Sequence, residues 1–362
     1  MKYILVFICC LLFTGCGFKD IDKRFFVVAV GIDKDKEKEE NYLIHLKLAI
    51  TTTEQKMGES NSIVVSESAE TITEAVRIIK SRVDKELDFG HAKMILYGED
   101  VVKEDIRNVL DWFLRRRDIQ QIAWIGIGKP TAKDILELQP KSENIPGNAL
   151  FLGFGYSGTE TPYVASNYLF NFRRSLYERG ISAYLPIVSV KDDLFNINTM
   201  ALFEDFTMKH VLSKDETRIL YALMSDISKV DIDIEEEEGF KFILTLDHVN
   251  KEYQIVTPVD RQPFIDMRIS LEGIVEEATK ELTRDEIEKL NKIASNVAEE
   301  RVLSLLKKLQ GKKLDPFGFG LRYRATHRGE ESEKIEKWLS IYPNIDFRVS
   351  VDVNVEGTGV IE

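Results

Sequence analysis

The chain has 362 residues, of which 44% are hydrophobic and 30% are charged, and its formal net charge is -12. This length exceeds the usual size of one hydrophobic core, so we expect two or three domains. The negative charge repels phosphate groups and argues against general binding to nucleic acid or anionic lipid. The three cysteines, Cys9, Cys10 and Cys16, all lie in the first sixteen residues, which excludes disulfides and thiolate metal sites from the rest of the chain.

The first sixteen residues have the layout of an export signal. Lys2 precedes an eleven-residue apolar run, and the small residues Thr14 and Gly15 stand before Cys16. A spanning helix needs about 20 apolar residues, and this run is shorter. The string Phe-Thr-Gly-Cys resembles a bacterial lipobox, in which the cysteine thiol receives a diacylglyceryl group and becomes the new N-terminus. We therefore predict a signal peptide over 1–15 and lipidation of Cys16, with an ordinary secretory signal or an uncleaved helix as the alternatives.

Short apolar runs alternate with amphipathic segments over the next part of the chain. In the predicted strand 42–50, Ile44 and Leu46 share one face, while His45 and Lys47 lie on the other, which we expect to be partly wet. The spacing of apolar residues also predicts strands at 25–33, 94–97 and 122–127 and helices at 73–87, 105–115 and 131–138. This alternation favours mixed α and β layers.

The residue types needed for chemistry are present but are not arranged in known motifs. Gly126 to Pro130 lies between a predicted strand and a predicted helix, as a phosphate-binding loop does. Ala123 and Pro130 replace a required glycine and a required Ser or Thr, so we predict a structural turn. No HExxH spacing or Gly-x-Ser-x-Gly string occurs. The sequence thus predicts a protein that is not an enzyme and has no catalytic, cofactor or metal site.

The middle of the chain gives weaker periodicity. Residues 144–168 are rich in Gly, Ser, Thr and Asn, which predicts loops, and a helix is expected over 168–178. Pro186 marks 185–188 as an edge strand or connector, because proline has no N–H for a sheet ladder. We place a domain boundary in 191–198. The expected division is a lipidated N-terminus and linker at 16–24, an α/β region at 25–195 with room for two subdomains, and an α+β domain at 200–362.

The C-terminal region shows the clearest patterns. Apolar and polar residues alternate with period two over 265–271 and 345–355, which is typical of half-buried antiparallel strands. Between them, Thr283 and Glu286 form a capping-box pattern at the start of a long helix. We predict a multi-domain α+β fold with mixed and antiparallel sheets and packed helices, in which the long helix lies on an antiparallel C-terminal sheet. For the string Asp315 to Gly320 we expect tight packing beside this helix, with ligand binding as the alternative.

Several strings occur in an order that is characteristic of one family. They are the lipobox at Cys16, Val30 to Asp33, Phe89 to Asp100, Leu185 to Ile187, Gln310 to Asp315, Phe317 to Gly320, Trp338, and the final strand leading to Thr358 and Gly359. Together they resemble the Ger(x)C family, the lipoprotein C subunits of spore germinant receptors, over nearly the whole chain. Members usually carry Trp-Asp after the lipidated cysteine, where this chain has Gly17 and Phe18.

The resemblance implies a non-enzymatic lipoprotein at the outer face of the cytoplasmic membrane, which is the inner membrane of the spore. It also implies two membrane-embedded partners, the germinant receptor A and B subunits, and carries over one functional residue, Cys16. Our hypothesis is that the protein acts in receptor assembly or signal coupling when small nutrients trigger germination. The alternatives are a solute-binding lipoprotein of an envelope transporter, which would have two α/β lobes with parallel sheets, and an envelope hydrolase with a dispersed site.

Overall fold

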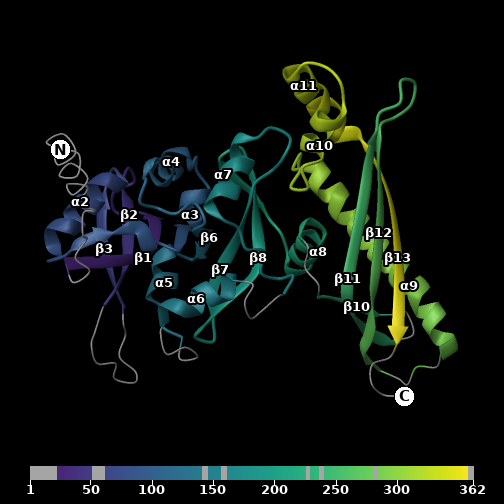
Figure 1. Ribbon diagram of the computed structural model, residues 1–362, viewed down its shortest axis with the longest axis horizontal. Helices are drawn as coiled ribbons and strands as arrows, with labels where there is room; N and C mark the ends of the chain where they lie inside the picture. The colour runs from purple at the N-terminus through teal and green to yellow at the C-terminus, as the bar shows by residue number, and fades with distance from the viewer. Residues whose placement is uncertain are drawn as a thin grey trace, which may run out of the picture.

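The computed structural model describes residues 23–50, 62–140, 146–155, 161–225, 229–235, 240–279, 282 and 284–357. These residues form two β-sheets that follow one another along the long axis of the molecule, with helix α8 (Lys214–Met224) between them (Figure 1). The predicted α+β fold with mixed sheets is confirmed.

Nine strands form the N-terminal sheet: β1 (Arg24–Lys34), β2 (Tyr42–Ala49), β3 (Ser62–Ala69), β4 (Glu86–Asp88), β5 (Met94–Gly98), β6 (Trp124–Lys129), β7 (Tyr184–Lys191), β8 (Leu194–Glu204) and β9 (Thr207–Val211). Their order is β3-β2-β1-β5-β6-β7-β8-β9, and β4 pairs with β1 off this path. The central strands β1, β5, β6 and β7 are parallel, whereas β2, β3, β8 and β9 pair antiparallel. The predicted strands at 25–33, 42–50, 94–97 and 122–127 are all confirmed within a few residues.

Helices cover both faces of this sheet, because its parallel centre consists of apolar runs that must be buried on both sides. One face packs against α2 (Ile72–Arg82), α3 (Glu99–Val102), α4 (Arg107–Arg115) and α7 (Leu169–Tyr177), and the other against α5 (Ala132–Glu137) and α6 (Pro146–Phe154). In Figure 1, α4 and α7 lie above the sheet and α5 and α6 below it. The prediction of loops over 144–168 is therefore wrong for α6. This helix forms because Leu150 and Phe154 pack into the hydrophobic cluster between the sheet and α5.

The prediction of a wet face on β2 is also wrong. His45 and Lys47 are 1% and 5% exposed, because α5 covers this face of the strand. The Lys47 Nζ donates a hydrogen bond to the Leu136 carbonyl at 2.8 Å. Burial lowers the pKa of Lys47 to about 8. Local alternation does not reveal a covering helix that comes much later in the chain.

Strand β7 is internal, which corrects the prediction of an edge strand or connector at 185–188. The sheet accommodates Pro186 because the ladder to β6 begins only at Ile187. On the other side, the partner Met200 uses its backbone groups elsewhere. Its N–H donates to Thr217 Oγ1 at 3.1 Å, and its carbonyl accepts from Leu212 N at 2.9 Å.

The segment 191–198 contains the turn of the β7–β8 hairpin and the start of β8. Asp192 and Asp193 form this turn with φ angles of 52° and 58°. Strands β8 and β9 then extend the N-terminal sheet beyond residue 195. Along the chain, the first sheet therefore ends with β9 and the second begins with β10. The predicted domain division, with one region ending at 195 and the next beginning at 200, stays a prediction.

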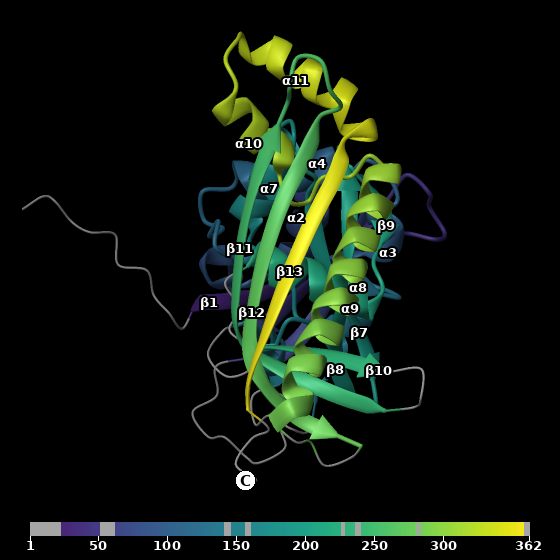
Figure 2. The ribbon, with the colours of Figure 1, turned by 90° about the vertical axis from the view of Figure 1, so that its right-hand side faces the viewer.

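The C-terminal sheet has the order β10 (Val230–Glu235), β11 (Lys241–Val256), β12 (Phe264–Ala278), β13 (Asp346–Gly357). The predicted long helix is α9 (Arg284–Gly311), which lies along β13 (Figure 2). Strands β10, β11 and β12 pair antiparallel, as predicted, but β13 is parallel to β12. The prediction of an antiparallel sheet is therefore wrong for its last strand. Helices α9, α10 (Phe319–Thr326) and α11 (Glu331–Ile341) form the crossover connection that parallel neighbours require.

One buried hydrophobic cluster joins the two sheets. It contains Met200 and Leu202 of β8, Leu220 of α8, Leu244 of β11 and Leu306 of α9. Helix α8 thus buries apolar side chains against both sheets at once. The two halves share a core, so their junction is a packed part of the fold.

Candidate functional site at the junction of the two sheets

The chain segment from α7 to β7, residues 178–184, meets the start of α10 at the junction. Ser182 N donates to the Asp315 carbonyl at 2.8 Å, and Asp315 N donates to Ser182 Oγ at 2.9 Å. Leu321 N donates to the Gly180 carbonyl at 3.1 Å. These bonds connect the backbone of one half directly to the other half, which fixes their relative positions.

Two glycines permit this close approach. A Cβ atom on Gly320 would lie 2.5 Å from Gly180 Cα and 2.6 Å from Trp338 Nε1, both closer than real contacts allow. Gly180 has a φ of 93°, a conformation that side chains disfavour. Trp338 is 1% exposed and closes the other side of Gly320. The predicted tight packing of the Asp315 to Gly320 string is confirmed.

Asp315 caps the first turn of α10. Its carboxylate accepts hydrogen bonds from Phe319 N at 3.0 Å and from Gly320 N at 2.8 Å. The side chain is buried, and burial raises the pKa of Asp315 to about 7, because loss of water outweighs the backbone N–H groups that favour the charged form. Burial, and to a lesser degree the charge of Asp315, raises the pKa of Tyr253.

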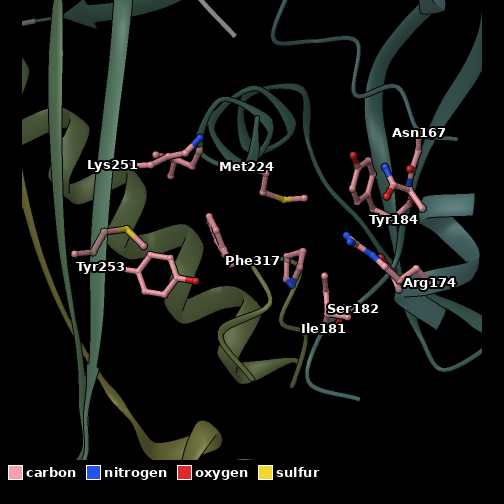
Figure 3. Close-up of a pocket in the computed structure, with 14 residues that line it drawn as sticks. Asn167, Arg174, Ile181, Ser182, Tyr184, Met224, Lys251, Tyr253 and Phe317 are labelled. Carbon is pink, nitrogen blue, oxygen red and sulfur yellow. The ribbon is translucent and has the colours of Figure 1, made fainter. Parts of the chain in front are cut away.

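A cavity of about 370 Å³ lies beside this capped helix start, between the two halves (Figure 3). Small-molecule sites commonly have volumes of about 300–1,000 Å³. The wall from the N-terminal half is mostly polar and includes Asn167, Asn171, Arg174, Ser175 and Tyr184. The wall from the C-terminal half is mostly apolar and includes Met224, Lys251, Tyr253, Met267 and Phe317.

The charge of the cavity differs from that of the whole chain. Its lining contains two cations, Arg174 and Lys251, and no carboxylate, although the formal net charge of the chain is -12. Lys251 Nζ donates to the Ser225 carbonyl at 2.6 Å. Within the described parts of the chain, the Arg174 guanidinium has no ion-pair or hydrogen-bond partner, and it points into the cavity (Figure 3). This arrangement suits a small anionic group.

A second place where ligands often bind, the carboxyl end of the parallel strands, is filled by the protein itself. Asp33 at the end of β1 accepts from Ala132 N at 2.8 Å and from Lys133 N at 3.0 Å, at the start of α5. Its Oδ2 lies 3.0 Å from His45 Nε2. The ring nitrogen is not oriented to form a hydrogen bond at this distance. Asp33 thus occupies the place where a phosphate would bind. The predicted structural turn at 126–130 is wrong for residues 126–129, which belong to β6, and only Pro130 lies outside the strand.

The predicted lipidation residue, Cys16, lies outside the described residues, so its modification stays a prediction. None of the helices in the described ranges is both long enough and apolar enough to span a bilayer. The same ranges contain no group of three or more His, Cys, Asp or Glu side chains placed to hold a metal ion.

Sequence reasoning did not identify Arg174 or Lys251 as site residues. They lie far apart in the chain, on α7 and β11, and belong to no local motif. The only signal was the Asp315 to Gly320 string, for which ligand binding was the alternative to packing. Phe317, inside that string, does line the cavity.

Two family models match the chain in order along its length. The model described as spore germination protein N-terminal domain matches residues 17–190, and the model described as spore germination B3/GerAC like, C-terminal, matches residues 198–359. The chain belongs to the Ger(x)C family of spore germination proteins. The resemblance predicted from the sequence is therefore confirmed.

Similar proteins cover almost the whole chain. Spore germination protein GerQC of Bacillus cereus is 22% identical over 100% of this chain and 99% of its own length. Spore germination protein KC of Bacillus subtilis (strain 168) is 20% identical over 99% of this chain and 95% of its own. The crystal structure of the GerBC protein matches with a TM-score of 0.60 and 15% identity, covering 91% of this chain and 97% of that one. This last similarity shows the shared fold.

Proposed function

We propose that this Ger(x)C protein is a membrane-anchored lipoprotein subunit of a spore nutrient germinant receptor. The observation that carries the proposal is the match of both halves, in order, to spore germination domains. In this proposal Cys16 carries the lipid and holds the folded body at the outer face of the cytoplasmic membrane, which is the inner membrane of the spore. The proposed partners are the A and B membrane subunits of the receptor.

The proposed role is non-catalytic and lies in receptor assembly or signal coupling. The hydrophobic cluster shared by the two sheets supports it, as do the backbone hydrogen bonds between 178–184 and α10. A body fixed in this way holds partner-binding surfaces at a constant spacing. The solute-binding alternative expects two lobes with parallel sheets, whereas the C-terminal sheet has two antiparallel pairings and one parallel pairing.

The proposal is tested by deleting the gene and complementing it with wild type, Cys16→Ala or Cys10→Ala. We expect the deletion to abolish germination with at least one nutrient while growth remains normal. Cys16→Ala should behave like the deletion and shift the protein from the membrane fraction to the soluble fraction, because two acyl chains at about 0.8 kcal/mol per methylene provide stable anchoring. Cys10→Ala, the matched control inside the apolar run, should restore germination.

Two results would contradict the proposal. Normal germination of the deletion strain with every nutrient argues against a receptor role. Retention of Cys16→Ala in the membrane fraction argues against lipid anchoring through this residue.

A further inference from the structure

We propose that the cavity at the junction binds a small carboxylate whose remaining part is apolar and about the size of one aromatic ring. The proposal goes beyond a role in assembly, and it does not depend on the identity of the receptor partners. It rests on the composition of the two cavity walls and on their origin in different halves of the protein.

The polar wall provides the anion-binding groups. Asn171, Arg174 and Ser175 are three and four residues apart on α7, so they share one face of the helix, and all three line the cavity. A guanidinium presents its N–H groups in a planar fork that matches both oxygens of a carboxylate. Because Arg174 has no side-chain partner in the described parts of the chain, this fork is available to a ligand. Lys251 adds a second positive charge from the opposite wall.

The apolar wall provides the contacts for the rest of the ligand. Phe317, Met224 and Met267 line this side, and methionine adapts to irregular apolar shapes. The Tyr253 ring packs edge-on against Phe319, with ring centroids 5.1 Å apart, which holds it in place. Figure 3 shows the Tyr253 hydroxyl directed toward the cavity, where it can donate a hydrogen bond.

A ligand in this cavity contacts both halves of the protein. Arg174 belongs to the helix layer of the N-terminal sheet, whereas Lys251 and Tyr253 lie on β11 of the C-terminal sheet. Binding therefore stabilises the packed junction over any arrangement in which the two halves separate. Binding of a small carboxylate would thus be coupled to the relative position of the two halves.

The test uses full-length protein in detergent and three probes. The probes share a phenyl ring and a three-carbon chain, and they differ in the charge of the group at the end of the chain. They are 3-phenylpropanoate, its neutral amide, and the cationic 3-phenylpropylamine, each measured by equilibrium dialysis up to about 10 mM, ten times the Kd of a weak millimolar site. We expect the carboxylate to bind at least about ten-fold more tightly than the amide or the amine, as a charge-assisted hydrogen bond requires. Arg174→Gln should abolish this preference, and Arg174→Lys should keep part of it.

Arg173→Gln is the matched control, because Arg173 is the preceding residue on α7 and its guanidinium lies over the Tyr177 ring, 5.8 Å from the centroid. This variant should bind 3-phenylpropanoate like the wild type. The proposal is overturned if none of the probes binds, if all three bind within two-fold of each other, or if Arg174→Gln binds the carboxylate unchanged. Arg174 is exposed, so the variants should retain the wild-type thermal unfolding transition, which is measured alongside.

Discussion

Asp33 and Asp315 perform the same local task in two different surroundings. Each is a buried carboxylate that accepts hydrogen bonds from two backbone N–H groups at the start of a short helix. Asp33 lies within one sheet, beside His45, and fills the position that α/β folds often offer to ligands. Asp315 lies at the junction, bonded through its backbone to Ser182, and an open cavity remains beside it.

The two helix starts differ in the space beside them: Asp33 and its neighbours fill theirs, whereas a cavity remains beside the one that Asp315 caps. The parallel centre of the N-terminal sheet is covered on both faces, and Asp33 occupies the start of α5. The junction joins two surfaces of different origin, so space remains between them. We therefore expect changes at Asp33 to affect stability alone and changes at the junction to affect both stability and ligand binding.

The largest expected effect is the pH dependence that Asp315 gives to stability. Its folded pKa of about 7 lies above the ordinary value of 3.8, so the folded protein binds more protons than the unfolded chain between these values. This contribution to the unfolding free energy should fall by about 4 kcal/mol as the pH rises from about 4 to about 8. Urea denaturation of wild type and Asp315→Asn across this range measures it. Parallel pH profiles for the two proteins would show that Asp315 does not titrate in this way.

A somewhat smaller effect is expected from Gly320→Ala. The added Cβ would overlap Gly180 Cα, a backbone atom that side-chain rotation cannot move away. We expect a loss of about 3 kcal/mol in unfolding free energy, measured by urea denaturation. Gly311→Ala is the matched control, because a Cβ there has no neighbour within 4 Å, and it should leave stability unchanged or slightly raised. Equal stability of the two variants would argue against a close junction.

Asp33→Ala should cost about 2 kcal/mol of unfolding free energy, since it leaves the buried Ala132 N and the partly buried Lys133 N without their acceptor. Binding of 3-phenylpropanoate should remain at the wild-type level, because Asp33 lies in the N-terminal sheet and does not line the cavity. Calorimetric unfolding and equilibrium dialysis measure the two quantities. A parallel loss of binding would remove the distinction between the two carboxylates.

The smallest effect concerns the surface ion pair between Glu178 and Arg324, which joins the two halves at an N–O distance of 3.1 Å. Glu178→Gln should change the unfolding free energy by less than about 0.5 kcal/mol, because exposed ion pairs contribute little. Arg324 also keeps its hydrogen bond to the Arg179 carbonyl, at 2.8 Å. A loss comparable to that of Gly320→Ala would mean that surface charge, not backbone packing, holds the junction.

The sequence predicted local structure well because the period of apolar residues is a local property. The capping box of Thr283 and Glu286 stays a prediction, because Thr283 lies outside the described residues. The alternation over 265–271 identified β12, and the apolar spacing over 73–87 identified α2, which begins at Ile72 and ends at Arg82. Alternation does not encode strand direction, so the antiparallel orientation predicted for β13 is wrong. Alternation also does not show whether a helix from later in the chain covers a strand face. For this reason the predicted solvent exposure of Lys47 is wrong, and the side chain is buried under α5.

The candidate site was harder to predict than the fold. Glycine and aromatic residues in the Asp315 to Gly320 string indicated close packing, and the structure adds the reason, which is contact with Gly180. Arg174 looks like any exposed helix residue in the sequence. Its significance comes from its position opposite Lys251 and Tyr253, and this position depends on how the two sheets pack.

The most direct test of the account is recovery of the native protein from spores, with mass spectrometry of its N-terminus and of whatever co-purifies. We predict that it partitions with the inner membrane, begins at a diacylglyceryl-modified Cys16, and carries the A and B receptor subunits with it. Recovery of a freely soluble, unacylated chain that still begins at Met1 and has no membrane partners would contradict the account.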